Sequence, residues 1–311
     1  MTIHRQQFSR RQFLQGCGAA TAALALGPRQ AHAADDFKLR YLLASSLYGT
    51  LPLAEILPEV VRSGAEALDV WPLKHGNQRE QITEMGNEKC AALLKQHNVQ
   101  LGCLTRFDLG PFKLAPELAF GKQFGAKLLV TGSGGSGKLA GAELKAALKK
   151  FVEDMQPHVE AATQAGIVLG IENHGSTMLA TPDAVRWFAE LSPSNHLGVA
   201  LAPYHLPQEP ALLAKLIEDL GPKLALFYAW EYGRGCMKKL PKDEEMMQLP
   251  GRGTLDFAPL LAALRKINYR GWTSIFMHPT PRGIPILPTA GEVTAAVNQA
   301  RQHLAACLAK P

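Results

Sequence analysis

Short apolar runs in this chain end repeatedly on polar, aromatic or charged residues, and a stretch with helical periodicity follows each run. The four clearest endings are Ile171-Glu172-Asn173-His174, Pro203-Tyr204-His205, Tyr228-Ala229-Trp230-Glu231 and Met277-His278-Pro279-Thr280. A strand buried in a parallel sheet is apolar along its length, so polar groups at its carboxyl end face whatever binds there. The pattern therefore predicts an α/β fold whose functional groups gather at one edge of a parallel sheet.

This unit of strand and helix recurs eight times after residue 38. The predicted strands are Leu39–Ala44, Ala65–Val70, Gln100–Thr105, Lys127–Thr131, Ile167–Ile171, Gly198–Leu201, Leu224–Tyr228 and Trp272–Phe276. Helical periodicity is clearest in Gly141–Ala165, Pro210–Leu220, Asp256–Ile267 and Ala290–Leu308. Eight successive units predict a single (β/α)8 TIM barrel over residues 34–311, with its active-site face at the carboxyl ends of the strands.

Residues 1–33 have the order of an export signal. Ser9-Arg10-Arg11-Gln12-Phe13-Leu14 is a twin-arginine pattern, a weakly apolar stretch follows, and Ala31-His32-Ala33 resembles a cleavage site. The apolar stretch is too short to span a bilayer as a helix, which argues against a stable membrane anchor. We therefore expect export by the twin-arginine route to the periplasm or the extracellular space.

The charge of the chain argues against a nucleic-acid partner. Its formal net charge is +6, but four of its 33 lysines and arginines lie in residues 1–33, which contain no acid. The remaining chain has 29 basic and 27 acidic residues, a nearly neutral balance. No CxxC spacing occurs among its cysteines, and the oligomeric state stays open.

A glycine-rich loop, Gly132-Ser133-Gly134-Gly135-Ser136-Gly137-Lys138, formally matches two nucleotide-binding motifs. The P-loop motif requires a Ser or Thr after the lysine to bind magnesium, and Leu139 occupies that position. The dinucleotide motif opens its domain, whereas this loop follows the fourth predicted strand. We therefore expect no nucleotide cofactor.

Three segments carry a family resemblance. The segments VLGIENH, LGVALAPYH and GWTSIFMHP, with the eight-unit pattern, resemble the xylose-isomerase-like TIM-barrel superfamily of sugar isomerases, epimerases and related endonucleases. The resemblance implies a divalent metal bound by Glu, Asp, His and Glu at the ends of strands five to eight. Glu172 matches the first ligand; Ala202 replaces the Asp, with His205 retained nearby, and Phe276 replaces the last Glu, with His278 two residues later.

The residues at these strand ends allow two kinds of chemistry. Glu172, His205, Glu231 and His278 could together bind one zinc, manganese or iron ion. Alternatively, Glu172 could act as a base and His205 or His278 as an acid in proton transfer without a metal. Each histidine alone could also be an ordinary hydrogen-bonding residue of the barrel.

Other residues suit a ligand the size of a sugar. Trp71, Tyr228 and Trp230 could stack on a pyranose ring, or simply pack at the barrel rim. Arg106 and Arg282 could bind a carboxylate or phosphate, or pair with acids of the protein. His174 lies beside Glu172 and is a further candidate for substrate binding.

A long connection from Glu231 to Gly253 follows the seventh predicted strand and has glycines at 233, 235, 251 and 253. Connections of this length at the active face often act as lids. The family resemblance and the polar strand ends together predict a carbohydrate or sugar-acid isomerase or epimerase that abstracts a proton next to a carbonyl. Two alternatives stay open: a keto-glycoside lyase or hydrolase, and a sugar-binding barrel without catalysis.

Overall fold

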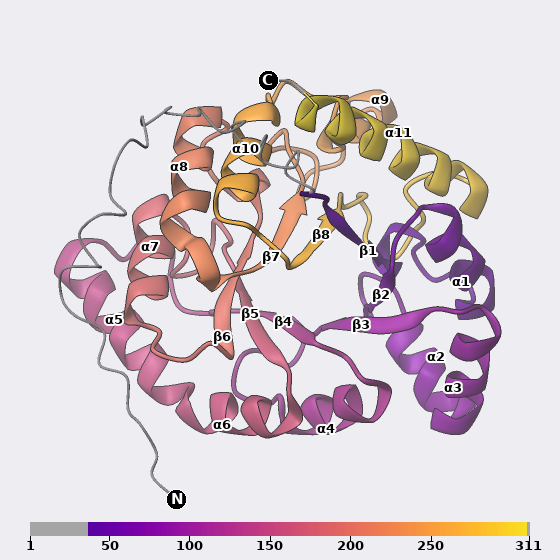
Figure 1. Cartoon of the computed structure of the whole chain (residues 1–311), viewed down its shortest axis with the longest axis horizontal. Helices are drawn as coiled ribbons and strands as arrows, with labels where there is room; N and C mark the ends of the chain where they lie inside the picture. The colour runs from indigo at the N-terminus through magenta and orange to yellow at the C-terminus, as the bar shows by residue number, and fades with distance from the viewer. Residues whose placement is uncertain (1–36, 310–311) are drawn as a thin grey trace, which may run out of the picture. The chain divides into compact units, whose positions relative to one another are not determined.

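Residues 37–309 are described by a computed structural model, in which residues 38–309 form a closed barrel of eight parallel strands. The strands pair in sequence order, and the last pairs with the first (Figure 1). They are β1 Arg40–Ala44, β2 Ala67–Val70, β3 Gln100–Thr105, β4 Leu128–Gly132, β5 Val168–Glu172, β6 Leu197–Leu201, β7 Leu224–Ala229 and β8 Trp272–Ile275. The predicted (β/α)8 TIM barrel is confirmed.

Helices form the layer outside the strands (Figure 1). The α-helices are α1 Leu53–Arg62, α2 Gln78–Met85, α3 Asn87–Gln96, α4 Ala115–Phe124, α5 Gly141–Asp154, α6 Gln156–Ala165, α7 Pro182–Leu191, α8 Pro210–Leu220, α9 Lys242–Glu245, α10 Ala258–Lys266 and α11 Ala290–Leu308. Short 3-10 turns are η1 Ser45–Leu47, η2 Pro203–His205, η3 Gly221–Lys223 and η4 Met246–Gln248. None of the helices within residues 37–309 is long and apolar enough to cross a bilayer.

The predicted strands agree with the observed ones to within two residues at each end, but one predicted helix is divided. The segment Gly141–Ala165 forms α5 and α6, which meet at Met155. Pro157 lies in the first turn of α6. A proline there has no N–H to donate and its ring clashes with the preceding turn, so α5 cannot continue through it. At the other end, Gly166 ends α6 with a φ of 68°, a conformation that glycine adopts at little cost.

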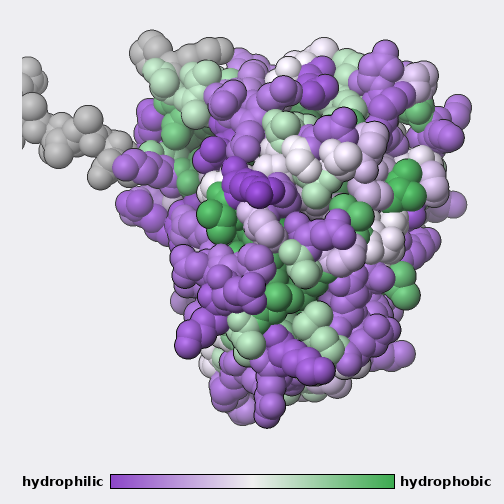
Figure 2. Space-filling model, turned by 90° about the vertical axis from the view of Figure 1, so that its right-hand side faces the viewer, coloured by the Kyte–Doolittle hydropathy of each residue, from purple (hydrophilic) through white to green (hydrophobic). Residues whose placement is uncertain are grey.

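Side chains of the strands contribute to the barrel interior and to the apolar layer between the strands and the helices. All five residues of β6 are buried, as expected for a strand that packs against helices on one side and the barrel interior on the other. The outer faces of the helices are polar. On the side of α1, α2 and α3, the surface is mostly hydrophilic, and hydrophobic side chains occur in small, interrupted groups (Figure 2).

Candidate active site

A cavity of about 570 Å³ lies at the carboxyl ends of the strands, the face predicted to bind the ligand. Segments that follow β2 to β8 contribute to its wall. Among the predicted site residues, the wall includes Glu172, His174, His205, Trp230, His278 and Arg282. The structure therefore brings together six side chains that lie at or after the ends of four different strands, β5 to β8.

Glu172 is the last residue of β5 and lies beside Gly132 of β4 and Ala200 of β6 in the sheet. Both neighbours are small, so they leave room for the carboxyl group at the bottom of the cavity. The residue is only 5% exposed. Burial raises the pKa of Glu172 to about 8, although the positive charges of His174 and Arg282 partly oppose this effect. Glu172 is therefore mostly protonated at neutral pH.

His205 lies next to Glu172, and its Nε2 atom is 3.6 Å from the Glu172 Oε1 atom. This Nε2 atom is buried and has no hydrogen-bond partner among the described residues. Burial, and then the positive charge of Arg282, lower the pKa of His205 to about 4. A neutral imidazole with a free nitrogen can accept a proton, and His205 lines the cavity.

The side chain of Asn173 fixes the positions of Glu172 and His205 relative to each other. Its amide nitrogen donates to the carbonyl oxygen of Ala202 over 3.0 Å, and its oxygen accepts from the backbone N–H of Ala202 over 2.7 Å. Asn173 follows Glu172 directly, and Ala202 precedes the turn that carries His205. The paired hydrogen bonds therefore tie the end of β5 to the end of β6.

Aromatic rings form the side of the cavity next to His205. Trp230 lies with its ring centroid 5.0 Å from that of His205 and 5.5 Å from that of His278. Its indole N–H donates to the side-chain oxygen of Gln248, which fixes the ring. The Nδ1 atom of His278 has no partner among the described residues, and burial holds the pKa of this histidine well below its usual value. His174 bonds to the Ser176 hydroxyl over 2.8 Å.

Arg282 gives the cavity a positive charge. Its Nη1 atom donates to the carbonyl oxygen of Pro279, and the described part of the chain offers it no acidic partner. Its charge contributes to the lowered pKa values of His205 and His75. Lys74 lines the same cavity. An oxyanion or a carboxylate of a ligand would be stabilised here.

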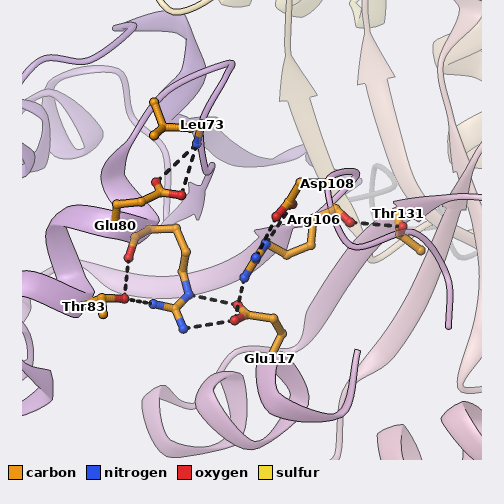
Figure 3. Close-up of polar contacts among 8 residues, drawn as sticks. Leu73, Glu80, Thr83, Arg106, Asp108, Glu117 and Thr131 are labelled. Carbon is orange, nitrogen blue, oxygen red and sulfur yellow. Dashed lines mark hydrogen bonds and ion pairs between the residues drawn. The ribbon is translucent and has the colours of Figure 1, made fainter. Parts of the chain in front are cut away.

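Two of the predicted charged site residues lie outside the cavity wall. Arg106 forms ion pairs with Glu117 over 2.5 Å and with Asp108 over 2.8 Å, which occupy its guanidinium group (Figure 3). Glu231 is fully buried and accepts backbone N–H groups of Gly251 and Leu255. Each charged group is satisfied by the protein, so neither is available to the ligand as predicted.

Trp71 and Tyr228 were predicted to stack on a sugar, and both are buried beneath the cavity rather than lining it. The Trp71 indole N–H donates to the carboxyl group of Asp69 over 2.6 Å, and its ring stacks on Phe276. Tyr228 is fully buried in the barrel interior. These rings support the cavity floor. Trp230 lines the cavity, but it is also almost fully buried, and its ring stacks on that of Tyr204 with the centroids 4.0 Å apart.

Sequence reasoning missed three residues of this region. Lys74 and His75 line the cavity from the turn that follows β2. Asp69 lies fully buried within β2, and burial raises its pKa to about 7. An acid inside an otherwise apolar strand is a visible signal, because burying a charge is costly unless it is protonated or paired.

The strand-end residues do not fit the metal site that the resemblance implies. Within residues 37–309, no three His, Cys, Asp or Glu side chains are grouped to bind a metal. Ala202 and Phe276 carry no ligand atoms in their side chains, and the Glu231 carboxyl group is bonded to backbone N–H groups. Catalytic zinc sites have three protein ligands, and in the described part of the chain Glu172, His205 and His278 are not grouped closely enough to supply them. We therefore derive no step through a metal.

The connection from Glu231 to Gly253 is partly anchored. Cys236 and Met237 line the cavity, and Met237 is 77% exposed. Further along, the Gln248 side chain donates to the carbonyl oxygen of His278. The anchored part fixes one cavity wall, while the part near Met237 stays at the surface.

Residues 57–307 match the family described as xylose isomerase-like TIM barrel. The chain belongs to this family. The predicted resemblance is thereby confirmed, and the cavity lies on the face that TIM barrels use for catalysis. Among curated proteins, none shows a significant sequence match.

Solved structures share the barrel at low sequence identity. The IolI protein, described with a binding zinc atom, is 14% identical, with a TM-score of 0.67 and coverage of 88% of this chain and 100% of that one. An L-ribulose 3-epimerase is 17% identical, with a TM-score of 0.66 and coverage of 87% and 95%. The 3-keto-D-glucoside 4-epimerase YcjR from E. coli is 16% identical, with a TM-score of 0.63 and coverage of 85% and 100%. These similarities establish the fold.

Residues 7–27 match the twin-arginine translocation signal, which confirms the predicted export route. This segment and the predicted cleavage site at Ala31-His32-Ala33 lie outside the described residues. Replacing both Arg10 and Arg11 by Lys should retain the precursor in the cytoplasm, because this pair defines the signal. Fractionation and immunoblotting measure the outcome, and export at the normal yield would contradict it.

Proposed function

We propose that this protein is an exported carbohydrate isomerase or epimerase that moves a proton at a carbon next to a carbonyl group. The observation that carries the proposal is the Glu172–His205 pair, two buried titratable groups 3.6 Å apart in a cavity wall. Family membership and the epimerase names of similar structures support a small sugar or sugar acid as the ligand. The export signal supports action in the periplasm or outside the cell.

The pair holds one proton over a wide pH range. Between about pH 4 and about pH 8, Glu172 retains its proton and His205 is neutral. His205 Nε2 takes the proton from the substrate carbon. The electron pair of the broken C–H bond forms a C=C bond, and the π electron pair of the carbonyl group moves onto its oxygen. Glu172 donates its proton to that oxygen. The roles expected from sequence are thus exchanged, because burial favours the uncharged form of each group.

Completing the reaction returns the pair to its starting state. For isomerisation, the Glu172 carboxylate removes the proton of the neighbouring hydroxyl group, and the His205 imidazolium protonates the neighbouring carbon. The Arg282 guanidinium stabilises negative charge that develops on the enediol oxygens.

A bell-shaped pH profile is the expected signature. The rate of proton–deuterium exchange at the substrate carbon should rise through about pH 4, as His205 loses its proton, and fall through about pH 8, as Glu172 loses its own. Nuclear magnetic resonance of sugars incubated with the protein in deuterated buffers measures this rate. Activity that keeps rising above pH 9 would instead make ionised Glu172 the base. Tight sugar binding without exchange at any pH would support a non-catalytic barrel.

A further inference from the structure

A second hollow adjoins the main cavity between the turn that follows β2 and the loop that follows β3. Its volume is about 520 Å³. Lys74, His75 and Phe107 line both spaces, so the hollow lies directly beside the site of Glu172 and His205. A group in the hollow would therefore lie close to a ligand in the main cavity.

Apolar groups dominate the walls of the hollow. Leu73 is 55% exposed and lines one side. Trp71 lies at the base, with its ring centroid 5.6 Å from that of Phe107 and 5.3 Å from that of His75. Aromatic and aliphatic walls of this kind favour a flat apolar group over a strongly hydrated one.

Two of the polar side chains that line the hollow, Asp108 and Thr105, are already bonded to the protein, and Lys74 and His75 lie where it meets the main cavity. Both oxygens of Asp108 accept hydrogen bonds from Arg106, over 2.9 and 2.8 Å (Figure 3). The Thr105 hydroxyl donates to the carboxyl group of Asp69. A hydrated ligand such as a second sugar would find few free hydrogen-bond partners here, and its hydroxyl groups would lose water without replacement.

The walls are also held in place before any ligand binds. The backbone N–H of Leu73 donates to the Glu80 carboxylate of α2 (Figure 3). On the other wall, Arg106 is fixed between Asp108 and Glu117, and Glu117 also pairs with Arg79. A preformed pocket costs a ligand less ordering entropy than one that must fold around it.

We propose that this hollow binds the apolar aglycone, an aryl group, of a glycoside whose sugar lies in the main cavity. The proposal rests on the proposed function, because it needs a sugar beside Glu172 and His205. It names the substrate class as aryl glycosides whose sugar carries a keto group, which the proposed proton transfer requires, rather than free monosaccharides. The space is sufficient, since an apolar protein cavity of about 150 Å³ already admits benzene.

The test compares binding of matched probes to the full chain. Phenyl and methyl β-glycosides of glucose, galactose and xylose are titrated by calorimetry, and phenol alone is soaked into crystals. The phenyl glycosides should bind about tenfold more tightly than the methyl glycosides, the gain expected from burying much of an aromatic ring. Leu73→Ser should reduce this gain to about threefold or less, because it removes apolar surface from the wall. Val61→Ser, at an exposed apolar position of α1, is the matched control and should keep the full gain.

Each outcome separates this proposal from the proposed function. Phenol bound in the hollow, together with the tenfold gain, supports both. Glycoside binding with no phenyl preference, or a preference for disaccharides, overturns the aglycone pocket and leaves the sugar site standing. Phenol in the hollow without binding of any glycoside would retain an aryl site and remove the carbohydrate function. Absence of both kinds of binding overturns the two proposals together.

Discussion

Replacing Glu172 by Gln should lower the rate of proton–deuterium exchange by about a hundredfold or more, the effect expected from removing a group that transfers the proton. Gln keeps the shape of the side chain but cannot give up or regain a carboxyl proton. Glu172 is buried, and burial raises the pKa of its carboxyl group to about 8. The neutral carboxyl group resembles the Gln amide in shape and charge, so the fold should tolerate the change. Sugar binding should weaken much less than turnover.

The matched variant is His205→Gln, which removes the other member of the pair and should cause a loss of similar size. The double variant should be little slower than either single variant, since the two groups act as one unit. Circular dichroism and thermal unfolding check that each variant is folded. A Glu172→Gln variant with full exchange activity would place the chemistry elsewhere on the barrel.

Replacing Glu231 by Ala should destabilise the protein by about 3 kcal/mol, because buried N–H groups would lose their acceptor. Its carboxyl group accepts hydrogen bonds from Gly251 over 3.1 Å and from Leu255 over 2.8 Å, and it is fully buried. The exchange rate per folded molecule should change by less than about threefold, since Glu231 lies outside the cavity wall. Urea unfolding measures the first effect and the exchange assay the second.

Glu231→Gln is the informative companion, since it keeps the size of the side chain and one acceptor oxygen. It should be more stable than the Ala variant. A Glu231→Ala protein of normal stability that has lost turnover would show that this acid takes part in the chemistry or binds a metal, as the strand-end pattern predicts.

The barrel could be predicted because the sequence patterns that indicate its strands and helix ends each lie within a short segment. Buried parallel strands require apolar runs, and helix ends such as Gly166 require residues that tolerate a positive φ, so both can be read without knowledge of the neighbours. The division of α5 from α6 at Pro157 is equally local, although the helical periodicity on either side concealed it.

The site was predictable only in part, because the direction of a side chain depends on partners far away in the sequence. Glu172 and His205 converge since parallel strands place their carboxyl ends together. Arg106 follows a strand in the same way, but Glu117 of α4 pairs with it away from the cavity. Glu231 is likewise bonded to a turn twenty and more residues later. Nothing in the segments around Arg106 and Glu231 indicates these partners.

The most direct test of the account follows the substrate proton itself. Sugars and aryl glycosides that carry a carbonyl group are incubated with the protein in deuterated buffer near pH 6, and the position of the label is determined by nuclear magnetic resonance. We expect deuterium at the carbon next to the carbonyl group, introduced by the wild-type protein and not by Glu172→Gln. If a sugar binds in the cavity but no deuterium is incorporated at that carbon, the result would contradict proton transfer by the Glu172–His205 pair.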